Sequence, residues 1–176
     1  AGMIADNFIT QKASEEFHQV LTPKVDGTIF IDNATAEIEL DFIVYFSSIA
    51  GAIGFVGQSD YASANSFMDQ YAQYRNALVE KGKRYGKTLS INWPLWKDGG
   101  MGIDNTTEEM VKQTIGMESL ETETGLKAFY TSLTSNVSQS LIIKGVPEKI
   151  KSHIYNQKSE AAQTVIQETK TSDNVS

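Results

Sequence analysis

The stretch FIVYFSSIAGAIGFVGQSDYASAN, residues 42–65, decides the fold of this chain. It begins with an apolar run over residues 42–46, without alternation, which is typical of a strand buried on both faces of a sheet. A glycine-rich turn follows, and the pattern then predicts a long helix from about Ser59 to Lys81. A buried strand that leads through a turn into a long helix indicates a parallel α/β sheet.

The segment before this stretch reads as two helices. Ser14 can cap a helix with acidic residues in its first turn. Thr22 can cap a new helix, and Pro23 then occupies its first position, where proline is favoured. This pair predicts that a second helix begins there.

The segments after it add two strands and two helices. Residues 88–92 and 140–144 suit short strands, and a capping box at Thr106 opens a short helix that ends near Gly116. A further amphipathic helix lies around residues 126–133. The predicted fold class is therefore α/β, with three strands of a doubly wound parallel sheet that has about six strands when complete.

Composition excludes several kinds of function. The formal net charge of −7 disfavours nucleic acid and anionic membrane surfaces, which reward basic proteins. No cysteine is present, so disulfides and thiolate metal sites are ruled out, in keeping with a cytoplasmic location. His18 and His153 lie far apart without a second ligand at metal spacing, and we predict no metal site. No apolar run is long enough to span a bilayer.

The glycines of the turn do not form a dinucleotide fingerprint. Gly51, Gly54 and Gly57 have the spacing GxxGxxG rather than GxGxxG. The next strand ends in Ile-Asn-Trp (91–93), without the acidic residue that holds a ribose. We expect these glycines to let the loop fold closely beneath a ligand.

Four residues carry a more specific pattern, namely Lys24, Ser48, Tyr61 and Asn65. Together with the surrounding stretch they resemble the active site of the short-chain dehydrogenase/reductase superfamily. In particular they are similar to ketoreductase domains of modular polyketide synthases, in which asparagine replaces the usual lysine four residues after the tyrosine and the lysine comes from upstream. The resemblance covers roughly residues 1–146.

The resemblance implies reduction of a ketone, and the residue types suit that reaction. A ketone that accepts hydride develops negative charge on its oxygen, so Ser48 and Tyr61 would donate hydrogen bonds to it. A tyrosine hydroxyl is a weak acid, and a nearby Lys24 ammonium would favour its ionised form as it gives up the proton. Asn65 lies on the same helix face as Tyr61 and would position Lys24 or a relay water.

A second segment agrees with this resemblance. The loop with Trp93, Pro94, Leu95 and Met101 resembles the segment that lies beside the nicotinamide and the substrate. Its Pro-Leu-Trp form is similar to ketoreductases of trans-acyltransferase synthases. Residues 102–120 would form a lid over the substrate, although an ordinary surface helix has the same pattern.

The implied enzyme is an NADPH-dependent β-ketoacyl reductase whose substrate is tethered by phosphopantetheine to an acyl carrier protein. In this family the cofactor-binding glycines lie before the fourth strand, whose end Ala1 and Gly2 resemble. We therefore expect residues 1–146 to be the C-terminal catalytic part, partnered by an N-terminal half and by other synthase domains, and residues 147–176 to be a helical, polar linker. The alternative is a non-catalytic structural or docking fragment.

The resemblance also bears on stereochemistry. Family members that give the D-alcohol, called B-type, often carry Leu-Asp-Asp after the fourth strand, and the second Asp corresponds to Asp6, 18 residues before Lys24. Members that give the L-alcohol carry a tryptophan eight residues before the tyrosine, where this chain has Ile53. Ala5 departs from the Leu-Asp-Asp pattern. The resemblance implies the D-alcohol, with Asp6 in stereocontrol.

Overall fold

The computed structural model describes residues 2–99 and 105–156. Its elements in chain order are η1 (Ile9–Gln11), α1 (Ser14–Ala34), β1 (Phe42–Ser48), α2 (Ile49–Ile53), α3 (Ser59–Glu80), β2 (Lys87–Trp93), α4 (Asn105–Thr114), α5 (Thr122–Thr134) and β3 (Gln139–Leu141). Residues 147–156 are also helical. No helix within these described ranges is both long and apolar enough to cross a membrane.

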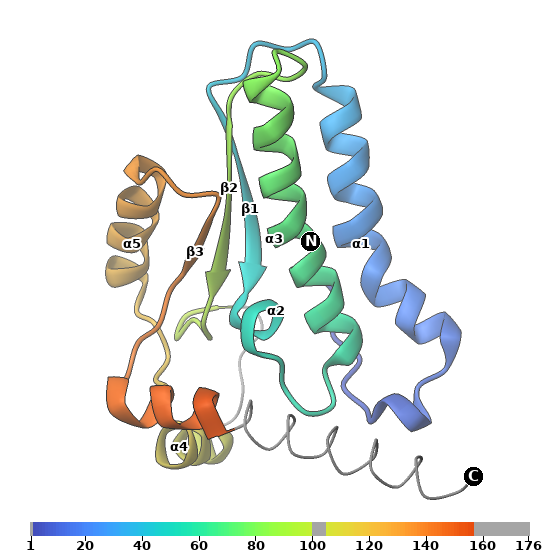
Figure 1. Ribbon diagram of the computed structural model, residues 1–176. Coiled ribbons are helices and arrows are strands. Elements are labelled where there is room, and N and C mark those ends of the chain that lie inside the picture. Colours follow the sequence, from blue (N-terminus) through green and yellow to red (C-terminus); the bar gives the residue numbers. More distant parts are fainter. Residues whose placement is uncertain (1, 100–104, 157–176) are drawn as a thin grey trace, which may run out of the picture.

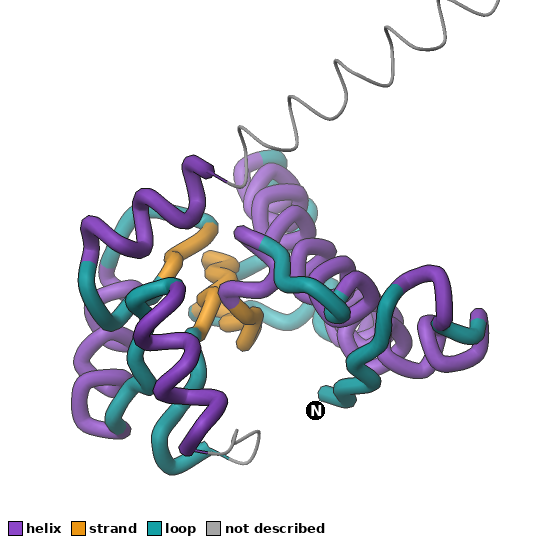
Figure 2. Tube along the Cα trace, turned by 90° about the horizontal axis from the view of Figure 1, so that it is seen from below, coloured by secondary structure: helices purple, strands orange, loops and turns teal. Residues whose placement is uncertain are grey.

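The three strands form one parallel sheet in the order β1-β2-β3. Helices cover both faces, with α1 and α3 on one side and α5 on the other (Figures 1 and 2). The register pairs Phe42 with Lys87 and Ser48 with Trp93, so β1 and β2 end at the same level. The predicted α/β fold with three parallel strands is confirmed.

Hydrophobic clusters on the two faces hold the layers together. On one face Leu89 and Ile91 of β2 pack with Leu120 and with side chains of α5. On the other face Tyr45 of β1 packs against Met68 and other residues of α3. Because β2 is buried along most of its length, this strand is the centre of the fold.

Helix α1 corrects the prediction of two helices. It runs without interruption through Pro23 from Ser14 to Ala34. The Thr22 hydroxyl donates to the His18 carbonyl at 2.9 Å, one turn earlier, rather than capping a new helix. A proline removes one backbone donor, and the packing of α1 along α3 outweighs that loss over the long helix.

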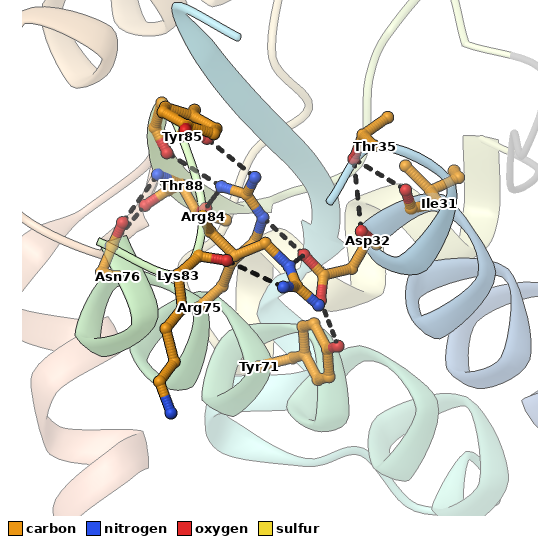
Figure 3. Close-up of polar contacts among 11 residues, drawn as sticks. Ile31, Asp32, Thr35, Tyr71, Arg75, Asn76, Lys83, Arg84, Tyr85 and Thr88 are labelled. Atoms are coloured by element: carbon orange, nitrogen blue, oxygen red, sulfur yellow. Dashed lines mark hydrogen bonds and ion pairs between the residues drawn. The ribbon is translucent and has the colours of Figure 1, made fainter. Parts of the chain in front are cut away.

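A buried ionic cluster fixes α1 against α3 (Figure 3). Asp32 of α1 accepts hydrogen bonds from Arg75 at 2.8 Å, from Arg84 at 3.0 Å and from the Tyr71 hydroxyl at 2.9 Å. Burial alone raises the pKa of Asp32, but these three donors outweigh it and hold the pKa below its usual value. Arg75 also donates to Thr88, so the cluster ties both helices to the start of β2.

The basic residues after α3 have a structural explanation. Gly82 adopts a φ of +66°, which ends the helix as expected for a glycine after its last turn. Arg84 then turns back to Asp32. Gly82 and Arg84 therefore end α3 and connect its end to α1.

Candidate active site

The candidate site lies where β1 ends, which in parallel α/β sheets is the usual place for ligands. The last residue of the strand, Ser48, has an extended backbone and is followed directly by α2. Its hydroxyl accepts a hydrogen bond from the Ala50 amide at 3.2 Å and so caps α2. A hydroxyl both accepts and donates, so this cap uses only its acceptor function.

Lys24 reaches this strand end from the neighbouring helix α1. Its side chain is buried, and its ammonium donates to the Phe46 carbonyl at 3.0 Å. The same ammonium lies 5.9 Å from the centre of the Tyr61 ring. The structure therefore brings Lys24 and Tyr61 together from two helices, α1 and α3.

The environment of Lys24 determines its charge. Burial lowers the pKa of Lys24 to about 8, and the negative charge of Asp69 opposes that effect. The ammonium is therefore mostly protonated at neutral pH.

Asn65 lies one turn after Tyr61 and is fully buried. Its amide nitrogen donates to the Tyr61 carbonyl at 2.7 Å, within α3. Its side-chain oxygen has no hydrogen-bond partner among the described residues. A buried acceptor without a partner is costly, so this oxygen is suited to accept a hydrogen bond from Lys24, a water or a ligand.

A polar network behind the site was not foreseen from the sequence. The buried carboxylate of Asp69 accepts hydrogen bonds from Ser90 at 2.6 Å and from Asn92 at 2.7 Å. Asn92 also donates to the Ser48 carbonyl at 2.8 Å and to the Ser47 hydroxyl at 3.1 Å. The network joins α3 to the ends of β1 and β2 and so holds Ser48 in place.

One signal for this network was present in the sequence. Asp69 follows Asn65 by four residues and Tyr61 by eight, so all three lie on one helix face. Asn92 interrupts an otherwise apolar strand end. Buried polar residues are nearly always hydrogen-bonded, so two of them on adjacent elements predict a mutual contact.

Asp6 lies in the loop that precedes η1. Its carboxylate accepts from the Gln58 side chain at 2.9 Å, just before α3 begins. The Asn7 amide also donates to the Gly57 carbonyl at 3.0 Å. The loop is thus attached to the turn that leads into Tyr61.

The loop after β2 begins directly opposite Ser48. Trp93 is paired with Ser48 in the register of the sheet, and its ring packs against Trp96 at a centroid distance of 4.9 Å. Pro94 is buried and Leu95 is half-buried. Met101 lies outside the described residues.

The glycines of the turn serve packing and backbone conformation. A Cβ on Gly51 would lie 2.8 Å from the Ser66 backbone nitrogen and 2.9 Å from the Asn65 Cβ. Gly51 therefore allows a close approach between α2 and α3. Gly54 and Gly57 adopt φ of +72° and +82°, which a turn requires and other residues rarely adopt.

Comparisons with known proteins agree with this geometry. The KR domain family matches residues 1–98. The chain is 52% identical over 155 residues to polyketide synthase PksL of Bacillus subtilis (strain 168), covering 88% of this chain and 3% of that protein. It is 46% identical over 154 residues to polyketide synthase PksN of the same strain, again with 88% and 3% covered.

Solved structures give the same result. A ketoreductase domain from the bacillaene assembly line superposes with a TM-score of 0.85 at 44% identity, covering 88% of this chain and 37% of that one. An N-terminal ketoreductase from the macrolactin assembly line gives a TM-score of 0.75 at 42% identity, with 88% and 29% covered. The chain thus spans only a small part of the length of these relatives. Because the family model matches more than half of the chain, the chain belongs to the KR, or ketoreductase, domain family.

Proposed function

We propose that this chain carries the catalytic residues of a trans-acyltransferase-type synthase ketoreductase, which reduces a β-ketoacyl thioester on an acyl carrier protein to the β-hydroxyacyl thioester. The observation that carries the proposal is the buried ammonium of Lys24 beside Tyr61 at the end of β1. Membership of the KR family and the polyketide synthase names of the relatives support the substrate class.

The residues present fit a nicotinamide cofactor, and NADPH when bound would supply the hydride. An ammonium has three donors, and the hydrogen bond to Phe46 accounts for one of those of Lys24. Lys24 and Tyr61 would hold the ribose next to the nicotinamide, and the segment 93–95 would flank the ring. The Asn65 side-chain oxygen, which has no hydrogen-bond partner among the described residues, gives the site a further acceptor.

The chain's own residues then account for the proton and the charge. Ser48 and Tyr61 donate hydrogen bonds to the ketone oxygen, which becomes negative as the carbon accepts hydride. Tyr61 transfers its phenolic proton to that oxygen and gives the alcohol. The Lys24 ammonium stabilises the phenolate left behind, and Asn65 holds a water through which the proton is replaced.

The expected product is the D-alcohol. The loop that carries Asp6 is attached beside the start of α3, where it can bias the side from which the pantetheine arm approaches Tyr61. Ile53 stands at the position where family members that give the L-alcohol carry tryptophan. Both features favour B-type stereochemistry.

The test uses the complete ketoreductase domain that contains this chain, a β-ketoacyl thioester and NADPH deuterated at the transferred position. We expect deuterium at the β-carbon of the product and a D-configured alcohol, measured by mass spectrometry and chiral chromatography. The isolated 176-residue chain is the matched control, and we expect no labelled product from it because it contains no GxGxxG turn.

Two outcomes would contradict the proposal at different levels. A labelled product that is mainly L-configured would overturn the stereochemical assignment alone. A folded complete domain that binds NADPH but transfers no deuterium would favour the alternative, a non-catalytic structural or docking role.

A further inference from the structure

A buried ion pair connects the loop of residues 2–12 to the helix that carries Tyr61. The Lys12 ammonium lies 2.5 Å from a carboxylate oxygen of Asp60 in the first turn of α3. The side chains of Lys12 and Asp60 are 2% and 0% exposed, respectively. Burial of two charges requires good geometry and further hydrogen bonds, so such a pair strongly restrains the two segments it joins.

Both partners of the pair have such further hydrogen bonds. The second oxygen of Asp60 accepts from the Tyr61 backbone amide at 2.8 Å. The Lys12 ammonium also donates to the Ala5 carbonyl, immediately before Asp6. A continuous chain of contacts therefore runs from Ala5 through Lys12 and Asp60 to Tyr61.

The loop has other attachments, but they differ in kind. The hydrogen bond between Asp6 and Gln58 is exposed, so water can replace either partner at little cost in free energy. The Asn7 amide donates to the backbone carbonyl of Gly57, a neutral partner in a turn with a φ of +82°. Among the described contacts, the Lys12–Asp60 pair is the buried, charged one that fixes the loop.

We propose that Lys12 and Asp60 are positioning residues that hold the loop of Asp6 at a fixed place relative to Tyr61 and thereby determine which face of the ketone is reduced. This inference rests on the proposed function. The pair does not touch the ketone itself. It acts through the loop at one end and through the backbone of Tyr61 at the other.

The pair also explains why a carboxylate occurs next to the reacting tyrosine. An acidic residue in the first turn of a helix is favoured by the helix dipole. The Lys12 ammonium pairs with this carboxylate, so the first turn of α3 contains no buried and unpaired charge at Asp60.

The experiment compares variants in the complete ketoreductase domain by two readouts. The first is amide hydrogen exchange at Asn7, which needs no activity. The second is the ratio of D- to L-alcohol from a β-ketoacyl thioester. We expect Lys12→Met to accelerate exchange at Asn7 at least about tenfold and to lower the D:L ratio about tenfold. Lys12→Arg, which keeps the charge, should preserve both.

Two further variants make the result decisive. The double variant Lys12→Met/Asp60→Asn leaves no buried charge unpaired and keeps an acceptor for the Tyr61 amide, so it should fold and still show the lowered ratio. Arg84→Met removes an ion pair remote from the loop and should leave the ratio unchanged.

The outcomes separate this inference from the proposed function. An unchanged D:L ratio in the double variant, or an equal loss in Arg84→Met, would overturn the positioning role. Unchanged exchange at Asn7 would show that the pair does not hold the loop. Absence of any alcohol from the wild-type domain would instead contradict the proposed function, while the exchange measurement would still decide whether the pair fixes the loop.

Discussion

The position of Lys24, which the proposed function requires, costs the fold stability. Its ammonium is buried, and burial lowers its pKa from 10.5 to about 8 despite the charge of Asp69. The unfolded chain therefore binds more protons than the folded one between these two pH values. By linkage, folding becomes more favourable as pH rises through this window, and the full burial penalty applies below about pH 8.

We expect Lys24→Met to stabilise the complete domain at pH 7 while abolishing reduction. A shift of one pKa unit corresponds to about 1.4 kcal/mol, and the lost hydrogen bond to Phe46 offsets part of the gain, so a net increase of about 1–2 kcal/mol is expected. The difference from wild type should shrink between pH 8 and pH 10.5, as measured by thermal unfolding.

The exposed Lys127→Met is the control, since its i,i+4 pair with Glu123 lies at the surface. It should change stability little at any pH. A Lys24→Met variant less stable than wild type at pH 7 would show that burial of the ammonium is not the dominant effect.

The resemblance to polyketide ketoreductases implied that Lys24 lies near Tyr61, and the structure places its ammonium 5.9 Å from the centre of that ring. The sequence was not sufficient to place Asp69, Lys12 and Asp60. Such residues are ordinarily assigned to solvent, and their burial depends on partners from distant segments. Only the tertiary structure shows that Lys12 meets Asp60, 48 residues later.

Among the elements, α2 decides how closely the end of β1 approaches α3. This short helix follows Ser48 directly and packs on α3 next to Asn65 through Gly51. A side chain at Gly51 would collide with the α3 backbone rather than with a flexible side-chain end. The position of Ser48 relative to Tyr61 therefore depends on the absence of a Cβ there.

A pair of glycine substitutions tests this packing. Gly51→Ala should destabilise the complete domain by about 1–3 kcal/mol, because it overpacks a close helix contact. Gly27→Ala in α1, where an added Cβ meets nothing within 4 Å, should stabilise it by about 0.5–1 kcal/mol. Chemical denaturation measures both, and equal effects of the two variants would contradict the packing argument.

The strands and the long helix α3 were predictable, whereas the short helix α2 and the exact limits of α1 and β3 were not. The apolar run at 42–46 and the helical pattern from Ser59 predicted β1 and α3 nearly at their observed limits. Local rules placed a helix start at Thr22, but α1 continues through Pro23. The packing against α3 and the Asp32 cluster act over the whole helix, and a local pattern does not contain them.

At the scale of the whole molecule, the sheet presents β1 as an edge of its described part. Phe42 and Phe46 of this strand are about half exposed, at 47% and 56%. An exposed apolar strand edge is a site for further pairing. The solved ketoreductase from the bacillaene assembly line is about three times as long as the part it shares with this chain.

The central claim is that Tyr61 donates the proton in a ketoreductase whose other catalytic groups are Lys24, Ser48 and Asn65. Tyr61→Phe in the complete domain removes one hydroxyl and keeps the ring beside Lys24. The phenolic proton matters only in the transition state, so its loss should appear in kcat rather than in cofactor binding.

The measurement is steady-state reduction of a β-ketoacyl thioester by wild type and Tyr61→Phe, together with NADPH affinity by calorimetry. We predict a fall in kcat of about 10²–10⁴-fold with NADPH binding nearly unchanged. Turnover at the wild-type rate by a folded Tyr61→Phe domain would contradict the account.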